Sequence, residues 1–349
     1  MTLRNVLTRF ALAWALSSPA QPLHAEVVFD WVAIGEVGNA CDPQPAQAIC
    51  PGAVAYDYAI ARFEVTNAQY AEFLNAVDPT GANLLALYDP FMGIDAAGGG
   101  IDLVSGNPAG AKYVVKTSGG FGGTGFASKP VTYIAFYDAI RFVNWLENGQ
   151  GSADTESGSY TLLGGTPIPS NDTSVARNPG ATIVLPDDDE WYKAAYSDPV
   201  SSGYFDDPTG TGTTTTCGPP SAFPNQANCA GPSVDGTTDV GSYPGSPSPY
   251  GTFDQGGNVY EWNETLVFEF ARGIRGGAYG APVALLAASS FDPSWPGNSP
   301  PVGGFRVASL AAAPPVPTSS NRLAPVLLVV GLLIAGVAWL RRRARVRRA

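Results

Sequence analysis

Apolar and polar residues follow each other at helical spacing directly after Thr66. In the segment 66–69, Thr-Asn-Ala-Gln, the threonine hydroxyl can accept from backbone N–H groups while the Gln69 side chain reaches back, which is the capping-box pattern. Apolar residues then recur every three or four positions: Tyr70, Phe73, Leu74 and Val77. The pattern predicts an amphipathic helix that begins at this cap.

Two further stretches have the same periodicity. Residues 137–147 offer apolar side chains for burial on one face: Ile140, Val143, Trp145 and Leu146. Another helix is predicted after Pro186, because Asp187 can cap it and Glu190 stands at the capping-box position. Behind that cap follow Trp191, Ala194 and Ala195. The sequence therefore predicts three helices.

Short strands and glycine-rich loops are expected between these helices. Four segments are predicted strands: 27–34, 56–63, 273–275 and 304–308. Residues 93–128 and 201–250 are rich in Gly, Ser, Thr and Pro, and long loops of this kind in a compact domain are typical of a binding surface. The 41 glycines and 31 prolines, with only 14% charged residues, favour a loop-rich globular domain over a helical bundle.

Residues 1–25 have the pattern of a secretory signal peptide. Arg4 and Arg9 form a basic region, an apolar run covers residues 10–16, and small residues precede cleavage sites after Ala20 or Ala25. The apolar run is too short to span a membrane. We therefore expect an exported protein whose mature domain covers residues 26–309.

The C-terminus has three parts: a Pro-rich linker (310–322), an apolar helix (323–340) and a basic tail (341–349). Eighteen residues at about 1.5 Å each span about 27 Å, close to the thickness of the hydrocarbon core. The arginines that follow favour a cytoplasmic tail, so the domain would face outward.

The arrangement resembles the C-terminal sorting signals that bacterial exosortases process, with Val316-Pro317-Thr318 in place of their Pro-Glu-Pro motif. Two alternatives stay open: a permanent single-pass transmembrane anchor, or processing that releases the domain. Both place the protein at the bacterial cell envelope or surface.

Charge is divided unevenly along the chain. Nine of the 19 basic residues lie in the two ends, and all 30 acidic residues lie between Glu26 and Asp292, so residues 26–309 carry a net charge of about −20. Such a surface repels phosphate backbones, which excludes nucleic acid as a partner. The one histidine, His24, lies at the predicted cleavage region, so catalysis by histidine and His-ligated zinc or iron are excluded from the domain.

Four cysteines, Cys41, Cys50, Cys217 and Cys229, allow three disulfide pairings. Disulfides persist in exported proteins, and the two local loops, 41–50 and 217–229, are the cheapest in chain entropy to close. Metal binding by all four is the alternative, although the spacing lacks a Cys-x-x-Cys pair. We expect structural disulfides.

Six ordered motifs cover nearly the whole domain: residues 58–70 (YAIARFEVTNAQY), 130–145 with Tyr137-Asp138-Ala139 and Asn144-Trp145, 185–195 (LPDDDEWYKAA), 250–262 ending in GNVYEW, 275–277 (RGG) and 304–307 (GFRV). Together they resemble the motifs of the formylglycine-generating enzyme (sulfatase-modifying factor) family. The resemblance implies one irregular, loop-rich α+β domain with a C-type-lectin-like topology.

The resemblance also implies bound calcium. At the matching positions, Asp254 and Glu261 would give side-chain oxygens, and Gly257 and Val259 backbone carbonyls. The residues agree with this, since carboxylates with carbonyls between them make a hard oxygen cage; the alternative is a solvated acidic turn. A second family site, with a departing spacing, would fall at Asn228, Cys229, Asp235 and Thr237.

The other motif residues are predicted to have structural roles. Trp145, Trp191 and Trp262 are expected in the core. Arg275 and Arg306 are expected to form buried bidentate ion pairs. Glu190 is the best candidate for an acid or base, but its capping role already explains it.

The family's namesake reaction oxidises a cysteine of a client sulfatase to formylglycine, with copper(I) held by two cysteines between the Arg-Gly-Gly and Gly-Phe-Arg motifs. Soft thiolates suit that ion, yet residues 278–303 contain no cysteine, so copper is not expected. A second branch of the family forms carbon–sulfur bonds with iron held by histidines of another domain, which this chain lacks.

Two functions remain. The one we favour is a calcium-stabilised binding or structural module, in which Tyr279, Phe291, Trp295 and the loops 93–128 and 201–250 form a recognition surface. Its ligand would be a glycan, a peptide, an exported protein or another envelope polymer. The alternative is an active oxidase acting on a client sulfatase.

Overall fold

The computed structural model describes residues 25–44, 49–230 and 234–310. The predicted signal peptide (1–25) lies outside the described residues except for Ala25, as does nearly all of the linker, apolar helix and basic tail (310–349), of which only Leu310 is described. Within the described ranges, none of the helices is long and apolar enough to cross a membrane.

The first sheet joins strands from both ends of the domain. Its order is β1-β2-β14-β5, with every neighbouring pair antiparallel. Ala308 lies opposite both Ile60 and Val184, so the last strand fills the middle of the sheet. The bounds are β1 Trp31–Ile34, β2 Tyr58–Ala61, β14 Ala308–Ser309 and β5 Ile183–Val184.

The second sheet has the order β12-β11-β10-β13. Its centre is an antiparallel hairpin of β10 (Tyr260–Val267) and β11 (Ala271–Arg275), with an irregular register between Trp262 and Leu266. The edges are β12 (Asp292–Ser294), antiparallel to β11, and β13 (Gly303–Gly304), parallel to β10. The strand predicted at 304–308 is therefore two short strands in different sheets.

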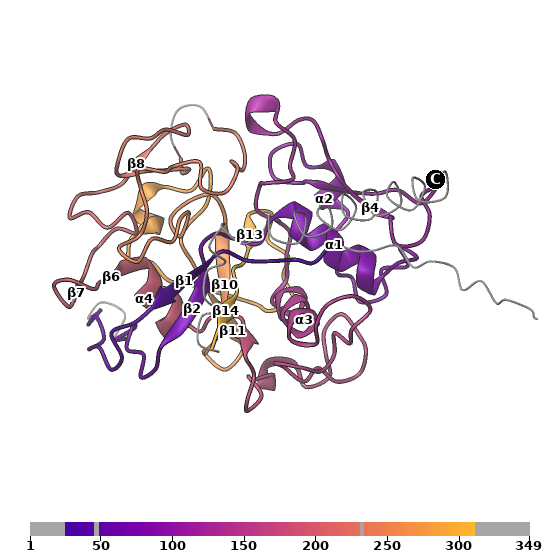
Figure 1. Cartoon of the computed structure of the whole chain (residues 1–349), viewed down its shortest axis with the longest axis horizontal. Helices are drawn as coiled ribbons and strands as arrows, with labels where there is room; N and C mark the ends of the chain where they lie inside the picture. The colour runs from indigo at the N-terminus through magenta and orange to yellow at the C-terminus, as the bar shows by residue number, and fades with distance from the viewer. Residues whose placement is uncertain (1–24, 45–48, 231–233, 311–349) are drawn as a thin grey trace, which may run out of the picture.

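The three predicted helices are confirmed as α1 (Asn67–Val77), α3 (Phe136–Glu147) and α4 (Asp188–Tyr196). Both predicted capping boxes are present: the Gln69 backbone N–H donates to Thr66 Oγ1 at 3.3 Å, and that of Glu190 to Asp187 Oδ1 at 2.7 Å. In the view of Figure 1, α1 and α3 lie to one side of the central strands and α4 to the other.

An aromatic cluster fills the core between α1, α3 and the strand ends. The Phe142 ring contacts those of Tyr70, Phe73, Trp145 and Phe305, at centroid distances of 5.3 to 6.0 Å. Edge-to-face contacts of this kind stabilise beyond the area they bury. The prediction that three tryptophans are core residues is confirmed, because Trp145, Trp191 and Trp262 are all fully buried.

The segments predicted as long loops, 93–128 and 201–250, contain more structure than expected. Antiparallel pairs form between β3 and β4 and between β6 and β7, and a parallel pair between β8 and β9. These strands have two or three residues, too few for an alternating pattern to be visible in the sequence. The remaining bounds are α2 Phe91–Ile94, β3 Ile101–Leu103, β4 Tyr113–Val115, β6 Ser197–Asp198, β7 Gly203–Tyr204, β8 Thr216–Cys217 and β9 Gln226–Ala227, with 3-10 turns at Phe121–Gly123, Asp172–Ser174 and Val283–Leu286.

Candidate functional site

The predicted recognition surface is assembled from loops far apart in the chain. Thr237 N–H donates to the Ala97 carbonyl at 3.0 Å, and Ile134 N–H to the Gly303 carbonyl at 3.3 Å. The first bond joins the segments near residues 97 and 237, and the second joins the segment near residue 134 to the interval 278–303. Of its aromatic residues, Trp295 is exposed, whereas Tyr279 and Phe291 are half-buried.

Tyr133, next to Ile134, is buried, with 7% of its surface exposed, and is held in a strained backbone conformation. Its φ of 60° is rare for a bulky residue and costs of order 1 to 3 kcal/mol. The hydroxyl donates to Asp95 Oδ2 at 3.0 Å, and the ring stacks on Phe91, which is 54% exposed. Backbone strain of this kind is concentrated at binding sites. The positive φ of Tyr133 could not be predicted from the pattern of apolar and polar residues.

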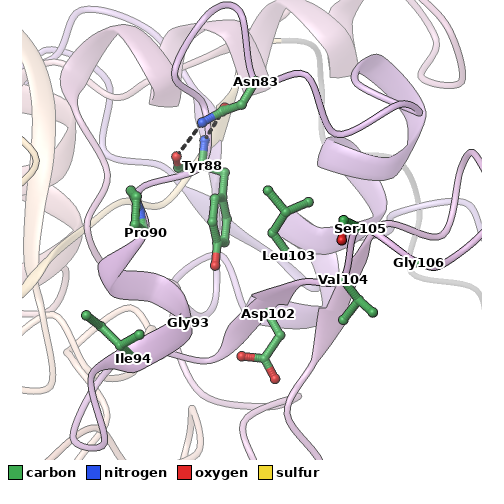
Figure 2. Close-up of a pocket in the computed structure, with 10 residues that line it drawn as sticks. All are labelled: Asn83, Tyr88, Pro90, Gly93, Ile94, Asp102, Leu103, Val104, Ser105 and Gly106. Atoms are coloured by element: carbon green, nitrogen blue, oxygen red, sulfur yellow. Dashed lines mark hydrogen bonds between the residues drawn. The ribbon is translucent and has the colours of Figure 1, made fainter.

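A hollow of about 640 Å³ lies on the other side of α2. Figure 2 shows the Tyr88 ring between Pro90 and Leu103, with the Asp102 carboxylate beside them. Gly93 keeps this hollow open, because a Cβ there would lie 2.7 Å from Tyr88 Oη. The hollow has mostly apolar walls and one carboxylate, a combination that suits an organic ligand. The sequence predicted the loop but not the hollow.

The predicted ion pair of Arg306 is confirmed. Its Nε lies 2.6 Å from Glu261 Oε2, its Nη2 lies 2.6 Å from Oε1, and both side chains are fully buried. Trp191 Nε1 also donates to Glu261, at 2.8 Å. Arg306 and Trp191 therefore both bind the Glu261 carboxylate.

The predicted pair of Arg275 is confirmed as well. The guanidinium binds both oxygens of Asp188, at 2.5 and 2.8 Å, and lies over the rings of Tyr192 and Phe291. Phe291 thus packs on a buried cation, which leaves less of its ring for ligand contact than the sequence suggested.

Three of the four residues of the first predicted calcium set, Asp254, Gly257 and Val259, lie in the loop before β10, and Glu261 is the second residue of that strand. Asp254 has a φ of 59°, and its Oδ2 accepts from Gly241 N–H at 2.6 Å. Gly257 must be glycine, since its φ is 89° and a Cβ would lie 2.3 Å from the Asn228 carbonyl oxygen. Val259 is buried and leads into Glu261.

Glu64 supplies a third carboxylate beside this turn, and no sequence pattern singled it out. It is buried, its Oε1 accepts from Asn258 Nδ2 at 3.2 Å, and its Oε2 has no hydrogen-bond partner. Burial, with repulsion from Asp254, raises the pKa of Glu64 well above its ordinary value. Burial also raises the pKa of Asp254, to about 6.

The carboxylates around this turn leave negative charge that a divalent cation would balance, although both oxygens of Glu261 are already bound by Arg306. Three carboxylates, Glu64, Asp254 and Glu261, face one guanidinium, and buried uncompensated charge is costly. Hard oxygen ligands suit Ca²⁺. Among the described residues no three His, Cys, Asp or Glu side chains converge as a metal cluster, so the site would need the Gly257 and Val259 carbonyls of the predicted set.

The second predicted set is partly brought together. Asn228 Nδ2 donates to the Gly236 carbonyl at 3.0 Å, which places Asn228 beside Asp235 and Thr237. Asn228 Oδ1 is buried without a partner, as expected of an atom awaiting a cation. Asp235 is exposed, and Cys229 lies in a disulfide, so only its carbonyl could serve.

Glu190 is committed to structure. Besides its capping bonds, it accepts from Arg177 at 2.9 and 3.1 Å and from the Tyr56 hydroxyl at 2.8 Å, and it is fully buried. A carboxylate with these partners and no exposed surface is poorly placed to exchange protons with a substrate.

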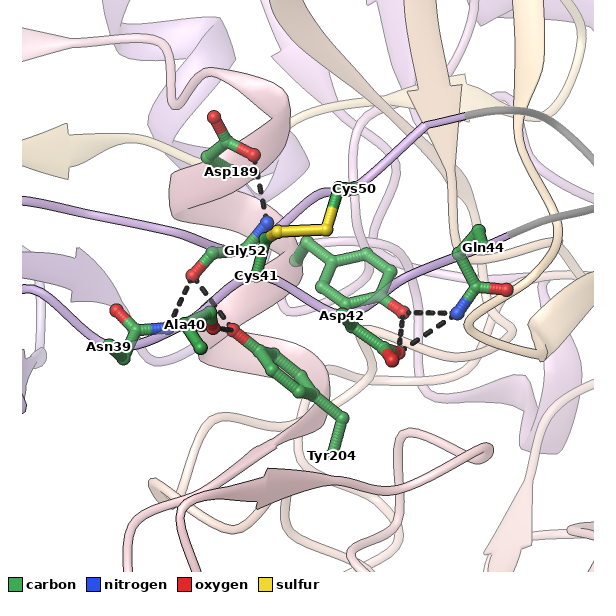
Figure 3. Close-up of a disulfide and its surroundings, with 10 residues drawn as sticks. Asn39, Ala40, Cys41, Asp42, Gln44, Cys50, Gly52, Asp189 and Tyr204 are labelled. Atoms are coloured by element: carbon green, nitrogen blue, oxygen red, sulfur yellow. Dashed lines mark hydrogen bonds between the residues drawn. A yellow bond between two sulfur atoms is a disulfide. The ribbon is translucent and has the colours of Figure 1, made fainter.

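The predicted disulfides are confirmed as Cys41–Cys50 and Cys217–Cys229. Figure 3 shows how the first is fixed near α4, where Gly52 N–H donates to Asp189 Oδ1 at 2.8 Å. The four cysteines are all used, and residues 278–303 supply none. A copper(I) centre of the family type does not fit this chain, because no thiolate is available for it.

Comparison with known proteins agrees with this fold. Residues 34–311 match the family described as "Sulfatase-modifying factor enzyme 1-like domain". No curated protein matches the chain. Among solved structures, Treponema denticola variable protein 1 is similar with a TM-score of 0.53 and 20% identity, covering 82% of this chain and 96% of its own. CarF is similar with a TM-score of 0.51 and 20% identity, covering 81% and 98%. At this identity the likeness shows the fold.

Proposed function

We propose a function for this chain, which belongs to the family of sulfatase-modifying factor enzyme 1-like domains. It is a calcium-stabilised binding module of that family and not an oxidase. One observation carries the proposal: both pairs of cysteines form disulfides outside the interval 278–303, where the copper-binding pair of the family would lie. The chain therefore has the fold of the family but lacks the cysteine thiolates that would bind copper(I).

Calcium would be held by Asp254, Gly257, Val259 and Glu261, and a second ion by Asn228, Cys229, Asp235 and Thr237. The support is one buried acceptor oxygen without a partner at each place, Glu64 Oε2 and Asn228 Oδ1. Bound Ca²⁺ supplies positive charge that fixes these loops; it has no part in any reaction we propose.

The ligand would bind on the face that carries Tyr133, Phe91 and Trp295, with the hollow beside Tyr88 extending it. The strain at the buried Tyr133 and the exposed rings of Phe91 and Trp295 support this placement. A glycan, a peptide or another exported protein of the envelope are the candidate ligands. The signal peptide and the C-terminal apolar helix would export the domain and keep it at the membrane, unless processing releases it.

An oxidase assay tests the proposal directly. Purified protein is incubated with copper, a reductant, oxygen and a Cys-x-Pro-x-Arg peptide of the sulfatase type, and the mass of the peptide is followed. We expect no conversion beside an active family member run as the control, since no thiolate can bind copper(I). Formation of the aldehyde would overturn the binding-module proposal in favour of the oxidase.

Calcium is expected to raise the melting temperature. At a free concentration 100 times the dissociation constant it should stabilise the fold by about 2.7 kcal/mol, or roughly 5 to 10 °C for a domain of this size. Asp254→Asn should lose most of this shift. Asp206→Asn, at an exposed carboxylate, is the matched control and should keep it. Equal melting temperatures in calcium and in chelator would contradict the calcium site.

A further inference from the structure

The hairpin of β10 and β11 ends in an exposed apolar tip. Leu266 is 44% exposed, Phe268 71% and Phe270 61%, and the two phenylalanine rings stack at a centroid distance of 6.3 Å. Val267 pairs with Ala271, so the three residues 268–270 form the turn. Three large apolar side chains exposed at the end of one hairpin, two in the turn and Leu266 in the strand before it, are unusual for a surface in contact only with water.

The backbone of this turn is unfavourable for the residues it carries. Phe268 and Glu269 have φ values of 51° and 64°, the conformation in which hairpins favour Asn-Gly. A phenylalanine there is strained as well as exposed. Within the domain, neither Phe268 nor Phe270 is covered. A residue that strains the backbone and makes no stabilising contact within the domain is expected where its side chain contacts another molecule.

The hairpin lies within reach of the proposed membrane anchor. Leu310, the last described residue, donates its N–H to the Thr182 carbonyl, and Glu264 at the base of the hairpin donates to the Pro186 carbonyl. Thr182 and Pro186 are four residues apart, and Glu264 is four residues from Phe268 at the tip. The tip therefore lies within about 40 Å of Leu310, where the described part of the domain ends. The segment 311–322 can extend about as far before the apolar helix begins.

The charge of the tip favours a neutral lipid surface. Glu269 is the single charged residue between Glu264 and Arg272, and Arg272 is buried. With no basic side chain, the tip has no electrostatic attraction to anionic lipids. Phenylalanine and leucine side chains do, however, partition into the apolar boundary of a bilayer.

We propose that the tip formed by Leu266, Phe268 and Phe270 docks into the zwitterionic lipid interface of the membrane to which the chain is anchored. The inference rests on the proposed anchoring. The tether keeps the tip at a high effective concentration near the bilayer, so a contact too weak for a free domain suffices. Docking fixes a second point of the domain on the membrane and so orients it.

Photo-crosslinking of the full chain in phosphatidylcholine vesicles tests this. Benzoylphenylalanine replaces Phe268 or, as the control, Phe223, which is 72% exposed in the loop between β8 and β9. In Figure 1, β8 lies far from β11, one of the two strands of the hairpin. We expect at least about five times more lipid adduct from position 268 than from position 223. The double substitution Phe268→Asn with Glu269→Gly, which suits the turn, should lower the adduct formed by a probe at position 270 by a similar factor.

Each other outcome overturns the inference. A protein that floats with the vesicles and gives equal lipid adducts at both positions refutes tip docking and leaves the anchoring intact. Crosslinks from position 268 to a second copy of the chain assign the tip to self-association. A chain that does not float with the vesicles refutes the anchoring, and tip docking with it.

Discussion

Replacing Arg306 with methionine is expected to lower the free energy of unfolding by about 3 to 5 kcal/mol in calcium-free buffer. The guanidinium is fully buried, binds both oxygens of Glu261, and donates to the carbonyls of Ala61 and Phe253. Its loss leaves the Glu261 charge buried without a counter-ion, although Trp191 Nε1 still donates to it, beside the carboxyl groups of Asp254 and Glu64. Urea unfolding followed by tryptophan fluorescence measures the change.

Arg62→Met is the matched control for this substitution. Arg62 also pairs with a carboxylate, that of Asp30, but the two side chains are 31% and 52% exposed, so the loss should be below about 1 kcal/mol. Adding Glu261→Met to Arg306→Met should recover part of the stability, because it removes the orphaned charge. If Arg306→Met lowered the free energy of unfolding no more than Arg62→Met does, the buried ion pair of Arg306 with Glu261 would not contribute to stability as the structure indicates.

Helices in this domain were predictable because their signals are local. Thr66 with Gln69, and Asp187 with Glu190, lie three residues apart, and each pair forms the capping box expected from its spacing. The strand bounds were less accurate: only residues 31–34 of the predicted segment 27–34 form β1, because β2 offers just four partners. A ladder ends where its partner ends, and the sequence of one strand does not contain that information.

The candidate sites show the same division. Arg275 and Arg306 were expected to form buried bidentate ion pairs and not substrate contacts, and both pairs form. Glu64 also lies in a family motif, but the raised pKa of its carboxyl depends on burial and on Asp254 and Glu261, almost 200 residues away in the sequence. The hollow beside Tyr88 likewise depends on Gly93 and on β3, whose contacts no short pattern encodes.

The stability of the domain is expected to fall as the pH rises from about 4 to about 7, in part because of Asp138. This residue of α3 is buried, and burial raises the pKa of its carboxyl to about 7, although the Ala135 N–H bond opposes the shift. The folded state therefore holds the proton more tightly than the unfolded chain, whose aspartate has a pKa of about 3.9. At a pH below both pKa values the carboxyl is protonated in the folded and the unfolded state, so its ionisation does not affect stability. At a pH above both values the buried charge lowers the free energy of unfolding by its full amount, at most about 4 kcal/mol.

Asp138→Asn should therefore be almost neutral at pH 4 and stabilising by about 2 to 4 kcal/mol at pH 8, because the amide oxygen can keep the bond from Ala135 without a charge. Chemical unfolding at both pH values measures this. Asp154→Asn is the control of opposite sign: bonds from Ser157 and Glu156 lower the pKa of the exposed Asp154 carboxyl, so its loss should destabilise slightly at pH 8 and not at low pH. An equal effect of Asp138→Asn at pH 4 and pH 8 would show that the carboxyl is not held protonated by burial, and that its place in the helix cap matters more than its charge.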